Sequence, residues 1–189
     1  MSTHEIFAAF VVNQPAGAPE PLAPLDWVGE LAERAGFALR VGAPDSADPL
    51  PYMEGDWLEL PVDVRFVEGE DYRALVVALG HSSFTRHAVR SGGAYLEQVV
   101  SAFGEACDAI APTYAYIVTA PEDDIQGYLK QVSVDVHGRD GQALTELGLP
   151  LLYVDGTFGT DLRPASPAVR VSTRRGVVLA AGESLTGWL

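Results

Sequence analysis

Two short stretches of the chain carry side chains of the kinds that transfer protons or attack a carbonyl carbon. Asp135 and His137 are two residues apart around Val132–Val136, a segment whose pattern predicts a strand, so both side chains are expected on one face. His81 and Ser82 follow an apolar segment, where an imidazole beside a hydroxyl could serve a nucleophile. Neither pair has a recognisable third group to orient the base, and the Gly-Xaa-Ser-Xaa-Gly motif of serine hydrolases is missing from the sequence. We therefore expect no enzyme; the alternative is a small hydrolase-like enzyme that uses Asp135/His137 or His81/Ser82.

The sequence predicts neither a metal site nor a bound cofactor. The four histidines do not show the paired spacing of zinc sites, and Cys107 is the only cysteine. The carboxylates lack the alternate spacing of a calcium loop, and no glycine-rich phosphate motif occurs. With one cysteine no internal disulfide can form, and we expect Cys107 to be an inert buried thiol in a helix.

An acidic stretch near the first third of the chain is the strongest functional signal. Between Arg40 and Arg65 there are six carboxylates, two large aromatic side chains and no basic residue. A surface of one charge sign attracts partners of the opposite sign, and aromatic side chains supply anchoring area. We expect a partner-binding surface formed by Asp45, Asp48, Tyr52, Glu54, Asp56, Trp57 and Glu59.

Part of this stretch has a second interpretation. Trp57 could begin a core strand, in which Glu59 and Asp63 would be only the polar face of an alternating pattern. The most distinctive part is then the preceding proline-rich loop, in which Asp45, Asp48, Glu54 and Asp56 surround Tyr52.

The net charge of −14 is concentrated at the beginning of the chain. Residues 1–60 carry ten acids and two arginines, a net −8, whereas residues 61–120 and 121–189 carry −3 each. This balance disfavours nucleic acid and anionic membrane surfaces as partners, because both are bound through Lys and Arg. A cationic protein partner is compatible with it. So is an acidic surface that only keeps the protein in solution, since eleven Arg and one Lys suggest a GC-rich genome in which such surfaces are general.

The length and the hydropathy pattern predict one domain that covers residues 1–189. The apolar segment Ile6–Val12 is too short for a membrane span and lacks the basic start of a signal peptide, so we expect a cytoplasmic protein. Between Trp57 and Val67 apolar and polar residues alternate, which predicts one strand with Pro61 at an edge or a bulge. Through Gly69–Asp71 this strand should form a hairpin with the next one.

The remaining elements follow from apolar periodicity and turn residues. A helix is expected over Leu25–Ala35, and a longer one begins near Ser91 and ends at Pro112. The predicted fold class is α+β, a mainly antiparallel sheet with two principal helices packed on it. The predicted strands are Ile6–Val12, Phe37–Val41, Trp57–Val67, Arg73–Gly80, Tyr114–Thr119, Val132–Val136, Leu149–Val154, Val169–Thr173 and Val177–Ala181.

Several motifs in the second half of the chain occur together in a known group of proteins. They are a long amphipathic helix over Gly93–Ala111, the sequence Pro112-Thr113-Tyr114-Ala115-Tyr116, the segments Leu151–Tyr153 and Phe158-Gly159, and a final strand with Gly176. In these features residues 90–182, about half of the chain, resemble the immunity proteins of bacterial polymorphic toxin systems, including type VI immunity proteins. The resemblance implies a cytoplasmic protein that binds and neutralises a cognate toxin, with no catalysis and no cofactor. An immunity protein-like inhibitor of a basic toxin domain is therefore our leading hypothesis.

Overall fold

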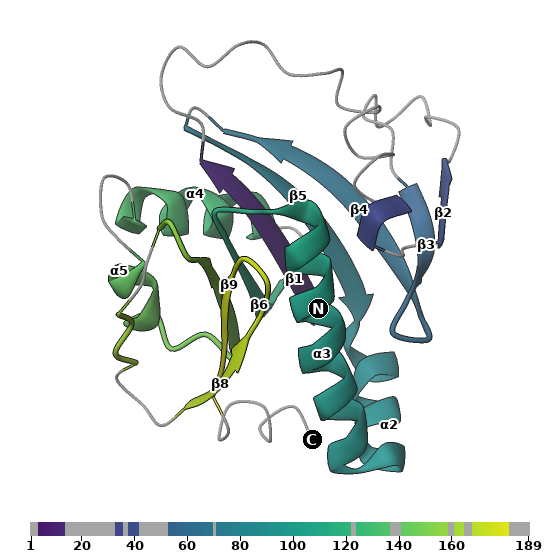
Figure 1. Ribbon diagram of the computed structural model, residues 1–189. Coiled ribbons are helices and arrows are strands. Elements are labelled where there is room, and N and C mark those ends of the chain that lie inside the picture. Colours follow the sequence, from purple (N-terminus) through teal and green to yellow (C-terminus); the bar gives the residue numbers. More distant parts are fainter. Residues whose placement is uncertain are drawn as a thin grey trace.

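The structure is a computed structural model, shown in Figure 1. It describes residues 4–13, 33–35, 38–41, 53–69, 71–121, 124–136, 141–158, 161–164 and 168–181. The helices are α2 (His81–Ser91), α3 (Gly93–Ile110), α4 (Ile125–Val136) and α5 (Gln142–Thr145). The strands are β1 (His4–Asn13), β2 (Ala38–Val41), β3 (Met53–Trp57), β4 (Leu60–Glu68), β5 (Tyr72–Gly80), β6 (Tyr114–Pro121), β7 (Leu151–Asp155), β8 (Ala168–Ser172) and β9 (Gly176–Ala181).

Within these ranges nine strands form one sheet, in the order β2-β3-β4-β5-β1-β6-β7-β9-β8. All neighbouring strands are antiparallel. The most apolar strands, β1 and β5, lie in the middle, where both faces of the sheet are covered. The predicted α+β fold, with a mainly antiparallel sheet and helices packed on it, is confirmed.

The sheet has a core on each face. On one face α2 and α3 cover the side chains of Ile6, Phe10 and Leu75, among others (Figure 1). On the other face α4 and α5 pack over Phe7 and Tyr116. Because β1 alternates between the two cores, its six consecutive residues from Ile6 to Val11 are all buried.

Of the two predicted principal helices, the longer one is confirmed as α3. It begins at Gly93 after Gly92, without a side-chain cap, and Ala111 in the left-handed region follows its end. The other, Leu25–Ala35, lies outside the described residues except for residues 33–35. The second helix packed on this face is α2, which begins at His81, directly after β5, and which the sequence did not predict.

One predicted strand, Val132–Val136, is wrong, and another, Trp57–Val67, is confirmed only from Leu60, where β4 begins. The stretch Trp57–Val67 is not one strand, because Leu58 and Glu59 form the two-residue turn of the β3–β4 hairpin. The apolar-polar alternation continues through this turn and hides it. Val132–Val136 belongs to helix α4, in which the buried Ile125, Leu129 and Val132 recur at helical spacing.

Candidate functional site

The acidic stretch of the sequence folds in part into the β3–β4 hairpin, and its turn has an unusual backbone. Leu58 and Glu59 have φ values of 56° and 62°, a conformation that usually requires glycine or asparagine. The turn is held from the side of α3, where the hydroxyl of Tyr95 donates a buried hydrogen bond of 3.0 Å to the carbonyl oxygen of Leu58. The hairpin is therefore anchored at its tip to a helix.

The hairpin also explains the position of Trp57. In a continuous strand Trp57 would share a face with Glu59, but in the hairpin it pairs with Leu60 and shares the face of that core residue. Its side chain is 7% exposed, and its ring packs edge-on against Phe10 at 6.3 Å between centroids. Trp57 is therefore a core residue, as the second interpretation of the acidic stretch predicted.

Strand register brings carboxylates together on the opposite face of the hairpin. A row of paired residues runs across five strands, from the buried Phe7 through Ala78, Asp63 and the exposed Glu54 to Arg40 on β2. Since directly paired residues share a face, Glu54 and Asp63 point to the same side. Asp56 pairs with Pro61 on that face.

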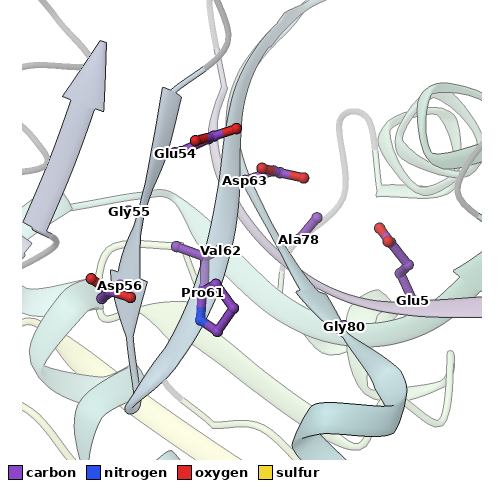
Figure 2. A pocket seen from close by; sticks show the side chains of 9 residues that line it. All are labelled: Glu5, Glu54, Gly55, Asp56, Pro61, Val62, Asp63, Ala78 and Gly80. Atoms are coloured by element: carbon purple, nitrogen blue, oxygen red, sulfur yellow. The ribbon is translucent and has the colours of Figure 1, made fainter. Parts of the chain in front are cut away.

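These carboxylates surround a hollow on the sheet, with a volume of about 490 Å³. Figure 2 shows Glu54 and Asp56 on β3, Asp63 on β4, and Glu5 across the hollow on β1. The remaining lining residues have small or medium-sized side chains: Gly55, Pro61, Val62, Ala78 and Gly80. Small side chains leave the space open, and the acids define its charge. We call this site the acidic hollow.

The acidic hollow is suited to attract cations. Glu54 and Asp56 are exposed, and Asp63 and Glu5 are half-buried. None of the lining side chains is basic, and the nearest basic residues in the register are Arg40, the β2 partner of Glu54, and Arg65, two residues after Asp63 on β4. Carboxylates accept charge-assisted hydrogen bonds from Lys and Arg, which are among the strongest in proteins. In the described part of the chain, no cluster of three or more His, Cys, Asp or Glu side chains is arranged to hold a metal ion.

The predicted partner-binding residues divide into three groups. Glu54 and Asp56 lie together at the acidic hollow, whereas Trp57 is in the core and Glu59 is exposed at the hairpin turn. Asp45, Asp48 and Tyr52 lie outside the described residues. The sequence did not predict Glu5 as a site residue, and it indicated Asp63 only as part of the polar face of a strand. The β4–β5 hairpin forms as the turn at Gly69–Asp71 predicted, but the pairing of β5 with β1, which brings Glu5 to the hollow, has no local signal in the sequence.

One of the two candidate catalytic pairs lies beside the acidic hollow, and the other is described only in part. His81 and Ser82 are the first residues of α2, directly after Gly80 at the edge of the acidic hollow. The strand that was to place Asp135 and His137 on one face is a helix up to Val136, and His137 lies outside the described residues. The strand on which the argument for this pair depended is therefore not formed.

Other titratable groups in the interior are structural. Burial, and to a smaller extent Asp108, raise the pKa of the Cys107 thiol well above its ordinary value. Burial also raises the pKa of Tyr114, Tyr116 and Tyr153, and neighbouring tyrosines add to the effect at Tyr116. These groups are therefore protonated and uncharged at neutral pH.

Among the described helices none is long and apolar enough to cross a membrane. Comparison of the chain with protein-family models, curated proteins and solved structures found no match.

Proposed function

We propose that this chain is a non-enzymatic binding protein, an immunity protein-like inhibitor that neutralises a basic toxin domain in the bacterial cytoplasm. The observation that carries the proposal is the acidic hollow. Four carboxylates from three strands are placed on one face around a space floored by small side chains. The toxin domain inserts Lys or Arg side chains into this hollow.

The volume of the hollow fits this role. At about 490 Å³ it lies within the range of roughly 300 to 1,000 Å³ typical of ligand sites. A guanidinium or ammonium group can approach Glu54 and Asp56 from solvent and reach Asp63 behind them. Each such contact is a charge-assisted hydrogen bond in a partly desolvated site.

Charge at this position also favours fast capture. A face lined by one sign of charge raises the rate of encounter with an opposite partner by roughly 10 to 1,000-fold at low salt. An inhibitor benefits from speed, since the toxin must be bound before it acts. The hairpin that carries Glu54 and Asp56 is anchored through Tyr95, so these two side chains need little reorganisation on binding.

The neighbouring upstream gene is identified first: the proposal predicts that it encodes a basic toxin domain, and a gene for a metabolic enzyme would contradict it. Binding of that domain is then measured with the full chain. In the hollow variant Glu54→Gln, Asp56→Asn and Asp63→Asn are combined. The control variant combines Glu97→Gln, Glu105→Gln and Glu146→Gln, three exposed acids outside the hollow, so that the net charge changes equally. We expect the association rate constant to fall about tenfold at low salt for the hollow variant only, and the difference to shrink at high salt. Equal losses in both variants, or no binding by the full chain, would overturn the proposal.

Growth of cells that produce the domain together with each variant separates inhibition from catalysis. The wild-type chain should restore growth, and the folded hollow variant should restore it less well. A chain with His81→Ala and Ser82→Ala should protect as well as wild type. Loss of protection in that folded variant would favour the hydrolase-like enzyme instead.

A further inference from the structure

The last strand of the sheet, β8, has the properties of an open docking edge. It is the terminal strand in the order, and in the described part of the chain no strand lies beyond it (Figure 1). Four of its five residues are exposed. Val169 is 64% and Val171 37% exposed, and they make up two of the three large exposed apolar side chains among the described residues. Exposed β-branched residues on a free edge are typical of strand addition.

The hydrogen bonds of the β8–β9 hairpin show which backbone groups face outward. The Thr173 N–H donates to the Gly176 carbonyl across the turn, at 3.0 Å. Hydrogen-bonded and non-hydrogen-bonded pairs alternate along an antiparallel ladder. Val171 and Val169 are therefore in hydrogen-bonded pairs with β9, and the N–H and C=O groups of Ser172 and Arg170 point away from the sheet. The Ala181 N–H, which donates to Pro150 on the other side of β9, fits the same alternation.

The side chains on this edge differ between the two faces. Val169 and Val171 pair with Ala180 and Val178, which belong to the core under α3, so they extend that apolar face outward. Arg170 lies on the opposite face, where its guanidinium donates to the carbonyl of Leu162 at 3.2 Å. An added strand would meet valine on one face and arginine on the other.

The charge of this edge is opposite to that of the chain. Residues 161–181 contain four arginines and one aspartate, a net charge of +3 in a chain of −14. Arg163 forms an ion pair with Asp161 at 3.2 Å. Asp108 of α3 accepts the backbone N–H groups of Arg174 and Arg175. At this edge Arg170, Arg174 and Arg175 outnumber the single carboxylate of Asp108, so the edge is cationic.

We propose that β8 binds an extended acidic segment of another protein, which adds to the sheet as a tenth, antiparallel strand. Its apolar residues contact Val169 and Val171, and its Asp or Glu side chains face Arg170. The charge argues against a second copy of β8, since a symmetric pair would bring the arginines of two edges together. This surface is at the opposite end of the sheet from β3 and β4 and does not rest on the proposed function.

The probe is a short synthetic peptide in which valine and glutamate alternate, labelled at one end, with a valine–lysine peptide as its counterpart. Binding to the full chain is measured by fluorescence anisotropy. Ser172→Pro removes one outward N–H and leaves the ladder to β9 intact, whereas Ser172→Ala keeps that N–H. We expect the valine–glutamate peptide to bind roughly tenfold more weakly to Ser172→Pro than to Ser172→Ala. Arg170→Glu, a second variant, should weaken it by at least as much.

Three outcomes would overturn the proposal. In the first, the valine–lysine peptide binds the wild-type chain as well as the valine–glutamate peptide does. In the second, Ser172→Pro and Ser172→Ala have the same urea midpoint and bind the valine–glutamate peptide equally well. In the third, the wild-type chain sediments as a dimer and Ser172→Pro as a monomer, so that the edge is occupied by a second copy. A folded Ser172→Pro that loses the acidic peptide alone would support the proposal.

Discussion

The hydroxyl of Tyr95, at the beginning of α3, donates a 3.0 Å hydrogen bond to the backbone carbonyl of Leu58, at the turn between β3 and β4. This bond joins two residues that are 37 positions apart in the chain. It restrains a turn whose two residues both have positive φ. The position of the strand that carries Glu54 and Asp56 thus depends on a helix on the other face of the sheet.

Tyr95→Phe should lower the free energy of unfolding by about 1 kcal/mol, because a buried carbonyl loses its donor. The matched control is Tyr116→Phe, since the Tyr116 hydroxyl is buried and has no hydrogen-bond partner in the described part of the chain. That control should be neutral or slightly stabilising. Urea denaturation of the three proteins compares them. Equal destabilisation by both substitutions would show that the Tyr95 bond contributes nothing specific.

Glu59→Gly should stabilise the protein. A residue other than glycine at a φ of 62° is strained by roughly 1–2 kcal/mol, and glycine gives back about 0.5–1 kcal/mol of this through its greater freedom in the unfolded chain. We expect a net gain of about 0.5–1 kcal/mol in urea denaturation. Glu59→Ala removes the same carboxylate but keeps the strained backbone, so it should show no such gain. If alanine stabilises as much as glycine, the effect comes from charge and not from the turn.

Stability should fall at alkaline pH. Burial, and then the carboxylate of Glu59, raise the pKa of Tyr95 to about 12, and burial raises the pKa of Tyr114, Tyr116 and Tyr153 as well. In the unfolded chain these groups titrate near about 10. Above that pH the unfolded state releases protons that the folded state still holds, so the free energy of unfolding decreases as pH rises from about 10 through the folded-state pKa values.

Urea midpoints measured from about pH 9 to about pH 11 would test this, with tyrosinate absorbance as the record of ionisation. Tyr95→Phe should lose less stability over that interval than wild type, because one of the shifted groups is gone. A midpoint that stays constant across the interval would contradict the assignment of these tyrosines to the interior.

The sequence predicted the elements whose pattern is local and missed those that depend on distant pairing. The apolar segment of β1 and the periodic face of α3 each show their burial within a few residues. The β3–β4 turn was missed because Leu58 and Glu59 carry no turn signal, and their strained backbone is stabilised by Tyr95. Helix α4 was missed because the alternation around Val134 resembles a strand, while packing on the sheet decides the outcome.

The residues of the acidic hollow also divide into those that the local sequence indicates and those that distant strand pairing brings to the site. The sequence pointed to Glu54 and Asp56 through the absence of basic residues around them. It did not indicate that Glu5 would lie across the same hollow, because Glu5 reaches it through the pairing of β1 with β5. A continuous strand from Trp57 to Val67 would also have placed Trp57 on the acidic face, and the hairpin turn reverses this.

The β8–β9 hairpin depends on a glycine at one position. A Cβ on Gly176 would overlap the carbonyl oxygen of Val154 and lie 3.0 Å from the Cα of Asp155, both backbone atoms of the neighbouring strand β7. Since backbone atoms in a sheet cannot move aside independently, Gly176→Ala should cost about 1–3 kcal/mol. Gly93→Ala is the control, because a Cβ there meets nothing within 4 Å and the residue is helical, so that substitution should stabilise by roughly 0.5–1 kcal/mol. Urea denaturation of the two variants should move their midpoints in opposite directions. A Gly176→Ala protein as stable as wild type would mean that β7 and β9 are not packed as closely as described.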